Sequence, residues 1–132
     1  MLDIKNRTIG IDFHGTIDKY THKFSVIMET LIKNGNTVYV ISGPVERKII
    51  EKLTKLGFKR KVHYTDVISI VDFLLMKKES LTLKDTGWWT DDETWWSSKA
   101  RICSEFDINV LVDNDERYRK YFPSYRDFIL VE

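Results

Sequence analysis

The chain has 132 residues, the usual size of one domain, and its 21 lysines and arginines against 20 aspartates and glutamates give a net charge of +1. Hydrophobic residues make up 42% and charged residues 31%, a composition that is typical of globular proteins and excludes a disordered chain. The balanced charge argues against an extended nucleic-acid-binding surface. The sequence also lacks the GxGxxG, GxxxxGK(S/T), HExxH, CxxC and GxSxG patterns of dinucleotide oxidoreductases, P-loop kinases, zinc proteases and serine hydrolases.

The cysteine count and the N-terminal segment predict the compartment. Cys103 is the single cysteine, so one chain can form neither a disulfide nor a cysteine zinc cluster. The segment MLDIKNRT lacks the apolar core of a signal peptide, and no run of about 18 apolar residues follows it. We therefore expect a cytoplasmic protein without a membrane segment, present as a monomer or a small homo-oligomer.

Apolar runs and helical stripes alternate along the first half of the chain. Residues 8–12 (TIGID) predict a buried strand, and residues 37–41 (TVYVI) predict a second one. Between them, apolar residues at helical spacing predict a helix that ends near Gly35. A stripe over 45–56 predicts another helix, with Pro44 in its first turn.

The second half continues the same alternation. Residues 62–64 predict a short third strand, and a stripe over 67–75 predicts a helix after it. Residues 80–90 alternate around a turn, and Thr90 with Glu93 fits a capping box that opens the next helix. The remaining predicted elements are a helix over 91–106, a strand over 108–112, a short helix over 115–122 and a last strand over 128–131.

Strands that alternate with helices imply right-handed crossovers and a parallel sheet. We expect one domain over 1–132 with an α/β fold, a three-layer Rossmann-like arrangement of about five parallel strands with helices on both faces. The spacing leaves no room for a large cap domain and allows only a small lid within 80–96. Ligand sites of such sheets lie beyond the carboxyl ends of the strands, and these ends carry Asp12, Ser42 and Asp113.

Three segments carry residues suited to chemistry. The Asp12 carboxylate, at the end of a buried strand, can act as a nucleophile or a metal ligand, and Gly15 lets the backbone turn its N–H groups inward. The segment 42–44 combines a serine hydroxyl with free N–H groups at a helix start, which suits an anion. The segment 113–115 adds hard oxygen ligands that suit Mg²⁺. Each segment alone is also explained as a turn or a helix cap.

In their order along the chain, four segments resemble the haloacid dehalogenase-like (HAD) phosphohydrolase superfamily. They read IGIDFHGTID, VYVISGP, SSKARIC and VLVDNDERY, and the resemblance covers residues 8 to about 118. The family has an apolar strand ending in Asp-x-Asp-Gly-Thr, then a strand ending in Ser or Thr, a Lys, and a strand ending in acidic residues. The resemblance implies a HAD-like fold of the small type without a large cap.

The resemblance also implies a Mg²⁺-dependent phosphatase that hydrolyses a phosphomonoester. Asp12 is then the nucleophile that forms an aspartyl-phosphate, and Lys99 offsets its charge and that of the phosphate. Mg²⁺ is then bound by Asp12, the main-chain carbonyl of His14 and Asp113, with Asn114 or Asp115 in a supporting role. The expected phosphate-binding residues are Gly15, Thr16, Ser42 and Gly43.

His14 is the main departure from the family pattern, because the family has a second aspartate at this position. An imidazole can perform the same acid–base work near neutral pH. The alternative is a catalytically weak or inactive HAD-fold protein that binds or sequesters a phosphorylated or nucleotide ligand. A third hypothesis is a structural or regulatory protein in which the motifs are relics.

All four tryptophans of the chain lie between residues 88 and 96. Aromatic faces can stack on a nucleobase, and they can equally pack a helix onto the sheet. They form two pairs, at 88–89 and 95–96. We expect one member of each pair to pack and the other to line the site, Trp89 in the first pair and Trp95 in the second. The expected partner is a small phosphorylated substrate, with a nucleotide as the candidate that the tryptophans suggest.

Overall fold

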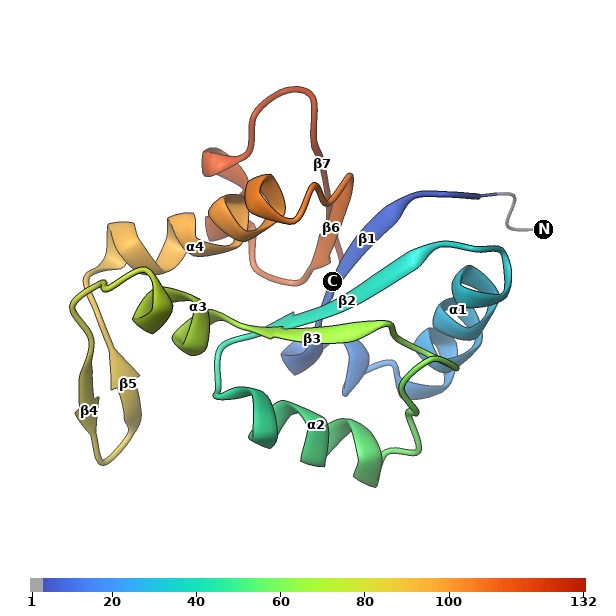
Figure 1. Cartoon of the computed structure of the whole chain (residues 1–132), viewed down its shortest axis with the longest axis horizontal. Coiled ribbons are helices and arrows are strands. Elements are labelled where there is room, and N and C mark those ends of the chain that lie inside the picture. Colours follow the sequence, from blue (N-terminus) through green and yellow to red (C-terminus); the bar gives the residue numbers. More distant parts are fainter. Residues whose placement is uncertain (1–3) are drawn as a thin grey trace.

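A sheet of five parallel strands forms the centre of the computed structural model, which describes residues 4–132 (Figure 1). The strands lie in the order β3-β2-β1-β6-β7, and every pairing between them is parallel. Their bounds are Thr8–Asp12 for β1, Thr37–Ser42 for β2, Asp66–Ser69 for β3, Val110–Asp113 for β6 and Asp127–Leu130 for β7. The expected α/β architecture with about five parallel strands is thus confirmed.

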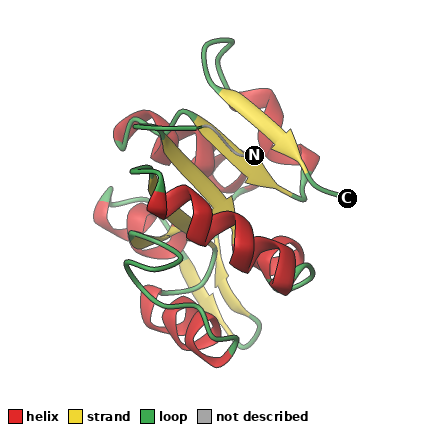
Figure 2. Cartoon of the chain, turned by 90° about the vertical axis from the view of Figure 1, so that its right-hand side faces the viewer, coloured by secondary structure: helices red, strands yellow, loops and turns green. Residues whose placement is uncertain are grey.

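Helices cover both faces of this sheet (Figure 2). Their bounds are Thr21–Lys33 for α1, Glu46–Lys55 for α2, Ile70–Met76 for α3, Asp92–Glu105 for α4 and Glu116–Tyr121 for the 3-10 helix η2. One core cluster joins the sheet to α1 and α2, and a second joins it to α3, α4 and η2. Val67 and Ile68, neighbours on β3, belong to different clusters because successive strand residues point to opposite faces. This arrangement is consistent with a Rossmann-like three-layer fold.

The register of the central strands determines where the polar residues at their ends meet. Asp12 pairs with Ile41 of β2, and Ile11 pairs with Val112 of β6. The next residue after each partner is therefore at the same carboxyl edge of the sheet, where β1, β2 and β6 end. Ser42 and Asp113 are these residues, so three distant segments contribute to one place.

The third strand and the helix after it differ from the prediction. Residues 62–64 form no named strand; the strand is β3 at Asp66–Ser69, and α3 begins only at Ile70. A short apolar run fits either a strand or a buried helix, and here pairing with β2 places Val67 and Ile68 in the sheet. The Ser69 side chain then caps α3 by accepting a hydrogen bond from the Asp72 N–H.

Two predicted helix starts also differ. Asp91, rather than Thr90, caps α4, because its carboxylate accepts from the Thr94 N–H at 2.9 Å. Pro44 precedes the cap residue Val45 of α2 and is not in the first turn of that helix. The other predicted helices agree with the structure to within a few residues, as expected for element boundaries.

Residues 80–90 form an antiparallel hairpin that projects beside α3 and α4 (Figure 1). Its strands are β4, Thr82–Lys84, and β5, Gly87–Trp89, so the predicted turn between them is confirmed. The hairpin occupies the segment where a small lid was expected. No helix within residues 4–132 is long and apolar enough to span a membrane.

Candidate functional site

The turn after β1 positions the first candidate residue, Asp12, whose side chain is buried at the end of the strand. A single π-helical turn, η1 (Phe13–Ile17), follows it and is kinked at His14 and Gly15. Gly15 has a φ of +80°, and a β-carbon there would lie 2.3 Å from Asn114 Nδ2. Only glycine therefore lets this turn close against the segment that follows β6. Inside the turn, Thr16 donates a hydrogen bond from Oγ1 to Asp12 Oδ2 at 3.2 Å.

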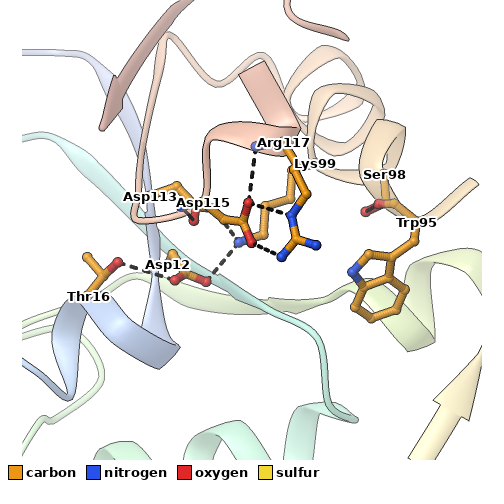
Figure 3. A network of polar contacts seen from close by, with 8 residues as sticks. All are labelled: Asp12, Thr16, Trp95, Ser98, Lys99, Asp113, Asp115 and Arg117. Carbon is orange, nitrogen blue, oxygen red and sulfur yellow. Dashed lines mark hydrogen bonds and ion pairs between the residues drawn. The ribbon is translucent and has the colours of Figure 1, made fainter. Parts of the chain in front are cut away.

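Lys99 joins the carboxylates of Asp12 and Asp113 (Figure 3). It comes from the buried face of α4, and only 1% of its surface is exposed. Its Nζ lies 2.8 Å from Asp12 Oδ1 and 2.5 Å from Asp113 Oδ2. The Asp115 N–H donates to the other oxygen of Asp113 at 3.0 Å. The structure thus brings together three of the predicted residues in one buried ionic cluster.

The cluster contains one ammonium group and two carboxylates, which leaves a buried negative charge. Burial opposes the charge of Lys99, yet the attraction of Asp12 and Asp113 raises its pKa above the ordinary lysine value, so the ammonium form persists. Burial also raises the pKa of Asp12; Lys99 opposes this effect and Asp113 adds to it. The surroundings therefore favour a further positive charge beside these carboxylates.

The oxygen atoms around Asp12 fit a magnesium ion. The Asn114 side-chain amide lies 3.0 Å from Asp12 Oδ2 and 3.1 Å from the main-chain oxygen of His14. Hydrogen bonding places the amide nitrogen toward both oxygens, to which it donates; three oxygens converge only when the amide turns its oxygen toward them, as a bound metal ion would require. In an octahedral Mg²⁺ site with metal–oxygen distances of about 2.1 Å, neighbouring ligand oxygens are about 3.0 Å apart. The excess negative charge suits this ion, and the spacing suits it once the Asn114 amide turns its oxygen inward.

The four predicted metal-ligating residues are therefore near one another. They offer different ligand groups: two carboxylates, a side-chain amide and a main-chain carbonyl. Among residues 4–132, no three histidine, cysteine, aspartate or glutamate side chains gather as a metal-binding cluster. Mg²⁺ usually keeps several waters and takes only one or two protein carboxylates, so two aspartates, an amide and a main-chain carbonyl match its needs.

A cavity of about 420 Å³ opens over the buried cluster and is the place where a ligand can reach Asp12. Ser42 and Gly43 line it from the end of β2, and Trp95 lines it from α4. Its further lining residues include Asp12, His14, Lys99, Asp113, Asn114 and Tyr118. A β-carbon at Gly43 would lie 3.2 Å from two atoms of the Trp95 ring, so this glycine makes room for the indole.

Three predicted binding residues do not line this cavity. Thr16 is fully buried behind Asp12, and Gly15 lies against Asn114, so both support the site from outside the cavity. Trp89 is half exposed on the hairpin, where its Nε1 donates to Thr86 Oγ1 at 2.9 Å. Of the two tryptophans expected in the site, the structure brings only Trp95 to the Asp12 cavity.

Asp18 is a residue that the sequence interpretation missed. Its Oδ2 lies 3.0 Å from His14 Nδ1, and its Oδ1 accepts a hydrogen bond from the Gly15 N–H at 2.6 Å. One carboxylate therefore holds both the imidazole and the turn. The available signal was the spacing, because a residue four positions after a histidine can return to it through one helical turn.

Tyr118 was also missed. Lys99 Nζ lies 4.5 Å from the centre of its ring, and burial raises the pKa of Tyr118 to about 12. The neutral ring packs against the ammonium group in a cation–π contact. No sequence signal marks this residue, because its contact with Lys99 depends on how η2 packs against α4.

Comparisons of the chain with protein-family models, with curated proteins and with solved structures give no match. The fold and the site therefore define the class of protein by themselves. It is an α/β protein with a parallel sheet whose carboxyl edge holds a buried lysine between two aspartates.

Proposed function

We propose that this chain is a HAD-like phosphohydrolase that removes phosphate from a phosphomonoester with the help of Mg²⁺. The observation that carries the proposal is the contact of Lys99 Nζ with both Asp12 and Asp113 in the buried lining of a cavity. These residues come from three separate segments, in the order in which the phosphohydrolase pattern has its nucleophile, lysine and acidic residue. The three side chains are buried and Lys99 touches both carboxylates, which supports a common role in catalysis.

In the proposed reaction, a carboxylate oxygen of Asp12 forms a bond to phosphorus while the ester P–O bond breaks. His14 gives a proton to the leaving oxygen and then accepts a proton from water. That water attacks the phosphorus of the aspartyl-phosphate, the bond to Asp12 breaks, and inorganic phosphate leaves. Lys99 and the Ser42 hydroxyl hold the phosphoryl oxygens, and Mg²⁺, when bound, supplies positive charge that stabilises the transferring group.

The contact between His14 and Asp18 supports the acid–base role of the histidine. When Nδ1 carries the proton that it shares with Asp18 Oδ2, Nε2 is left with a lone pair. An orienting carboxylate of this kind selects the tautomer of a catalytic imidazole. His14 also lines the Asp12 cavity, so it borders the space that a substrate would occupy.

Dependence of phosphate release on the metal tests the proposed function. Phosphate release from a panel of nucleotides and sugar phosphates is expected with Mg²⁺, and EDTA is expected to lower it by about 100-fold or more, because the excess buried negative charge then repels the phosphate. The measurement is a colorimetric phosphate assay, with melting temperatures recorded in both buffers. Equal rates with Mg²⁺ and EDTA, or no release from any compound, contradict the proposal.

A second candidate function rests on the exposure of the His14 side chain, 88% of which is accessible to solvent. An imidazole this exposed to water favours a protein that binds a phosphorylated ligand without hydrolysing it. Removal of the histidine and of its partner separates the two candidates, because only an enzyme depends on them for turnover.

For an enzyme, His14→Gln is expected to lower kcat by about 100-fold or more, since general acid–base catalysis is lost. Asp18→Asn is expected to lower kcat by roughly tenfold with little change in KM, because Asp18 acts by positioning the imidazole. The measurement is steady-state kinetics across pH. His14→Asp, which restores the aspartate of the family pattern, is the control for the binding hypothesis. A gain of activity from near zero would identify the parent chain as a binding protein, and a loss of activity would support the histidine as the acid.

A further inference from the structure

A groove of about 380 Å³ continues from the Asp12 cavity toward the β4–β5 hairpin. Both spaces share Gly43, Pro44, Lys52 and Trp95 in their lining. The groove then runs between α2 and the hairpin, where Lys48 and Trp88 line it. We call it the lysine–tryptophan groove. A substrate whose phosphate lies beside Asp12 has this route for its leaving group.

The charged residues that line the groove are two lysines, Lys48 and Lys52, and no aspartate or glutamate lines it. Lys48 and Lys52 lie one turn apart on α2, and both are exposed. Within residues 4–132, neither takes part in an ion pair or a side-chain hydrogen bond, whereas Arg47 on the same helix pairs with Glu51. Two unpaired ammonium groups at the same groove fit an anionic group on the ligand.

The tryptophans give the groove its second property. Trp95 and Trp88 line it from α4 and from the hairpin, and Gly43 leaves space beside Trp95. A β-carbon at Gly43 would press on the Trp95 ring, so the backbone is arranged to admit this indole next to the phosphate cavity. Indole faces stack on planar aromatic rings, and they do so with any nucleobase.

We propose that the lysine–tryptophan groove recognises a nucleotide that carries a second phosphate in addition to the one removed at Asp12. This inference rests on the proposed phosphohydrolase function and specifies its substrate class. The base stacks on Trp88 and Trp95, and the second phosphate binds Lys48 and Lys52. The same chemistry is offered by a free nucleoside bisphosphate and by the phosphorylated end of a single strand.

Calorimetric titration of the Asp12→Asn variant in Mg²⁺ tests the inference, because this variant binds without turnover. The probes are ribose 5-phosphate, adenosine 5′-monophosphate and adenosine 3′,5′-bisphosphate. We expect the dissociation constant to fall by about fivefold or more when the base is added, since base stacking on an aromatic residue has this strength, and to fall again with the second phosphate. Equal constants for the three probes overturn the inference.

Variants in the same background assign each half of the groove. Trp88→Leu is expected to remove the advantage of the base and to leave ribose 5-phosphate binding unchanged. Lys48→Gln is expected to weaken only the bisphosphate, and Lys55→Gln is the matched control, since Lys55 is on α2 but lines neither space. An unchanged bisphosphate constant in Lys48→Gln, or the same loss in Lys55→Gln, overturns the assignment of the second phosphate.

Two further measurements separate the possible outcomes. A 5′-phosphorylated hexanucleotide that binds more tightly than the bisphosphate identifies a strand end as the ligand, and weaker or equal binding identifies a free nucleotide. Phosphate release by the parent chain is measured in parallel. Selective binding without release contradicts the proposed function alone, and release without any preference among the probes contradicts the groove assignment alone.

Discussion

The Asp12→Asn variant is expected to lose phosphate release by roughly 10⁴-fold or more, because an amide cannot form the bond to phosphorus. The fold is expected to remain intact. Burial raises the pKa of Asp12, which means that the site disfavours the charged form of this side chain. An uncharged amide of the same shape is therefore tolerated there. The amide oxygen can still accept a hydrogen bond from Lys99 Nζ. We expect a melting temperature within about 4 °C of the parent value, which corresponds to about 1 kcal/mol.

The measurement is phosphate release at saturating substrate together with thermal unfolding followed by circular dichroism. Asp107→Asn is the matched control, because the Asp107 side chain is 90% exposed on the loop between α4 and β6. This control is expected to retain the parent rate. A rate for Asp12→Asn equal to that of the parent would falsify the nucleophile assignment, whatever the stability of the variant.

Replacing Lys99 by methionine is expected to have the largest effect on stability and to abolish activity as well. Methionine has a similar length but no charge, so it leaves the carboxylates of Asp12 and Asp113 buried without a cation. Removing one member of a buried ion pair typically costs about 3–5 kcal/mol, a large part of the stability of a domain. Chemical denaturation measures this loss, and Lys33→Met, in an exposed pair with Glu29, is expected to lose at most about 1 kcal/mol.

A double variant distinguishes this electrostatic cause from a simple packing defect. When Asp12→Asn is combined with Lys99→Met, one of the two unpaired carboxylates disappears. The double variant is therefore expected to be more stable than Lys99→Met alone, although the methionine packing is the same. A double variant that is as unstable as the single one, or less stable, contradicts the account of the buried cluster.

The sequence alone determined the elements whose patterns are local. The apolar run of β1 and the β-branched run of β2 bury both faces of each strand, and such runs are readable without knowledge of their partners. The helical stripes of α1 and α2 are also local, because one face of each helix must be apolar to pack on the sheet. The alternation of these strands and helices predicted the parallel sheet. It also predicted that Asp12, Ser42 and Asp113 lie at the same carboxyl edge of that sheet.

Only the tertiary structure decided the elements and contacts that depend on distant partners. Val67 and Ile68 fit a helix as well as a strand, and hydrogen bonding to β2 made them part of β3. Trp89 and Trp95 were equal candidates in the sequence, and the direction of the hairpin relative to α4 brought only Trp95 to the Asp12 cavity. The contact of Lys99 with Tyr118 has the same origin in packing. A sequence specifies such contacts only through the whole fold, because they join residues whose separation along the chain carries no periodic signal.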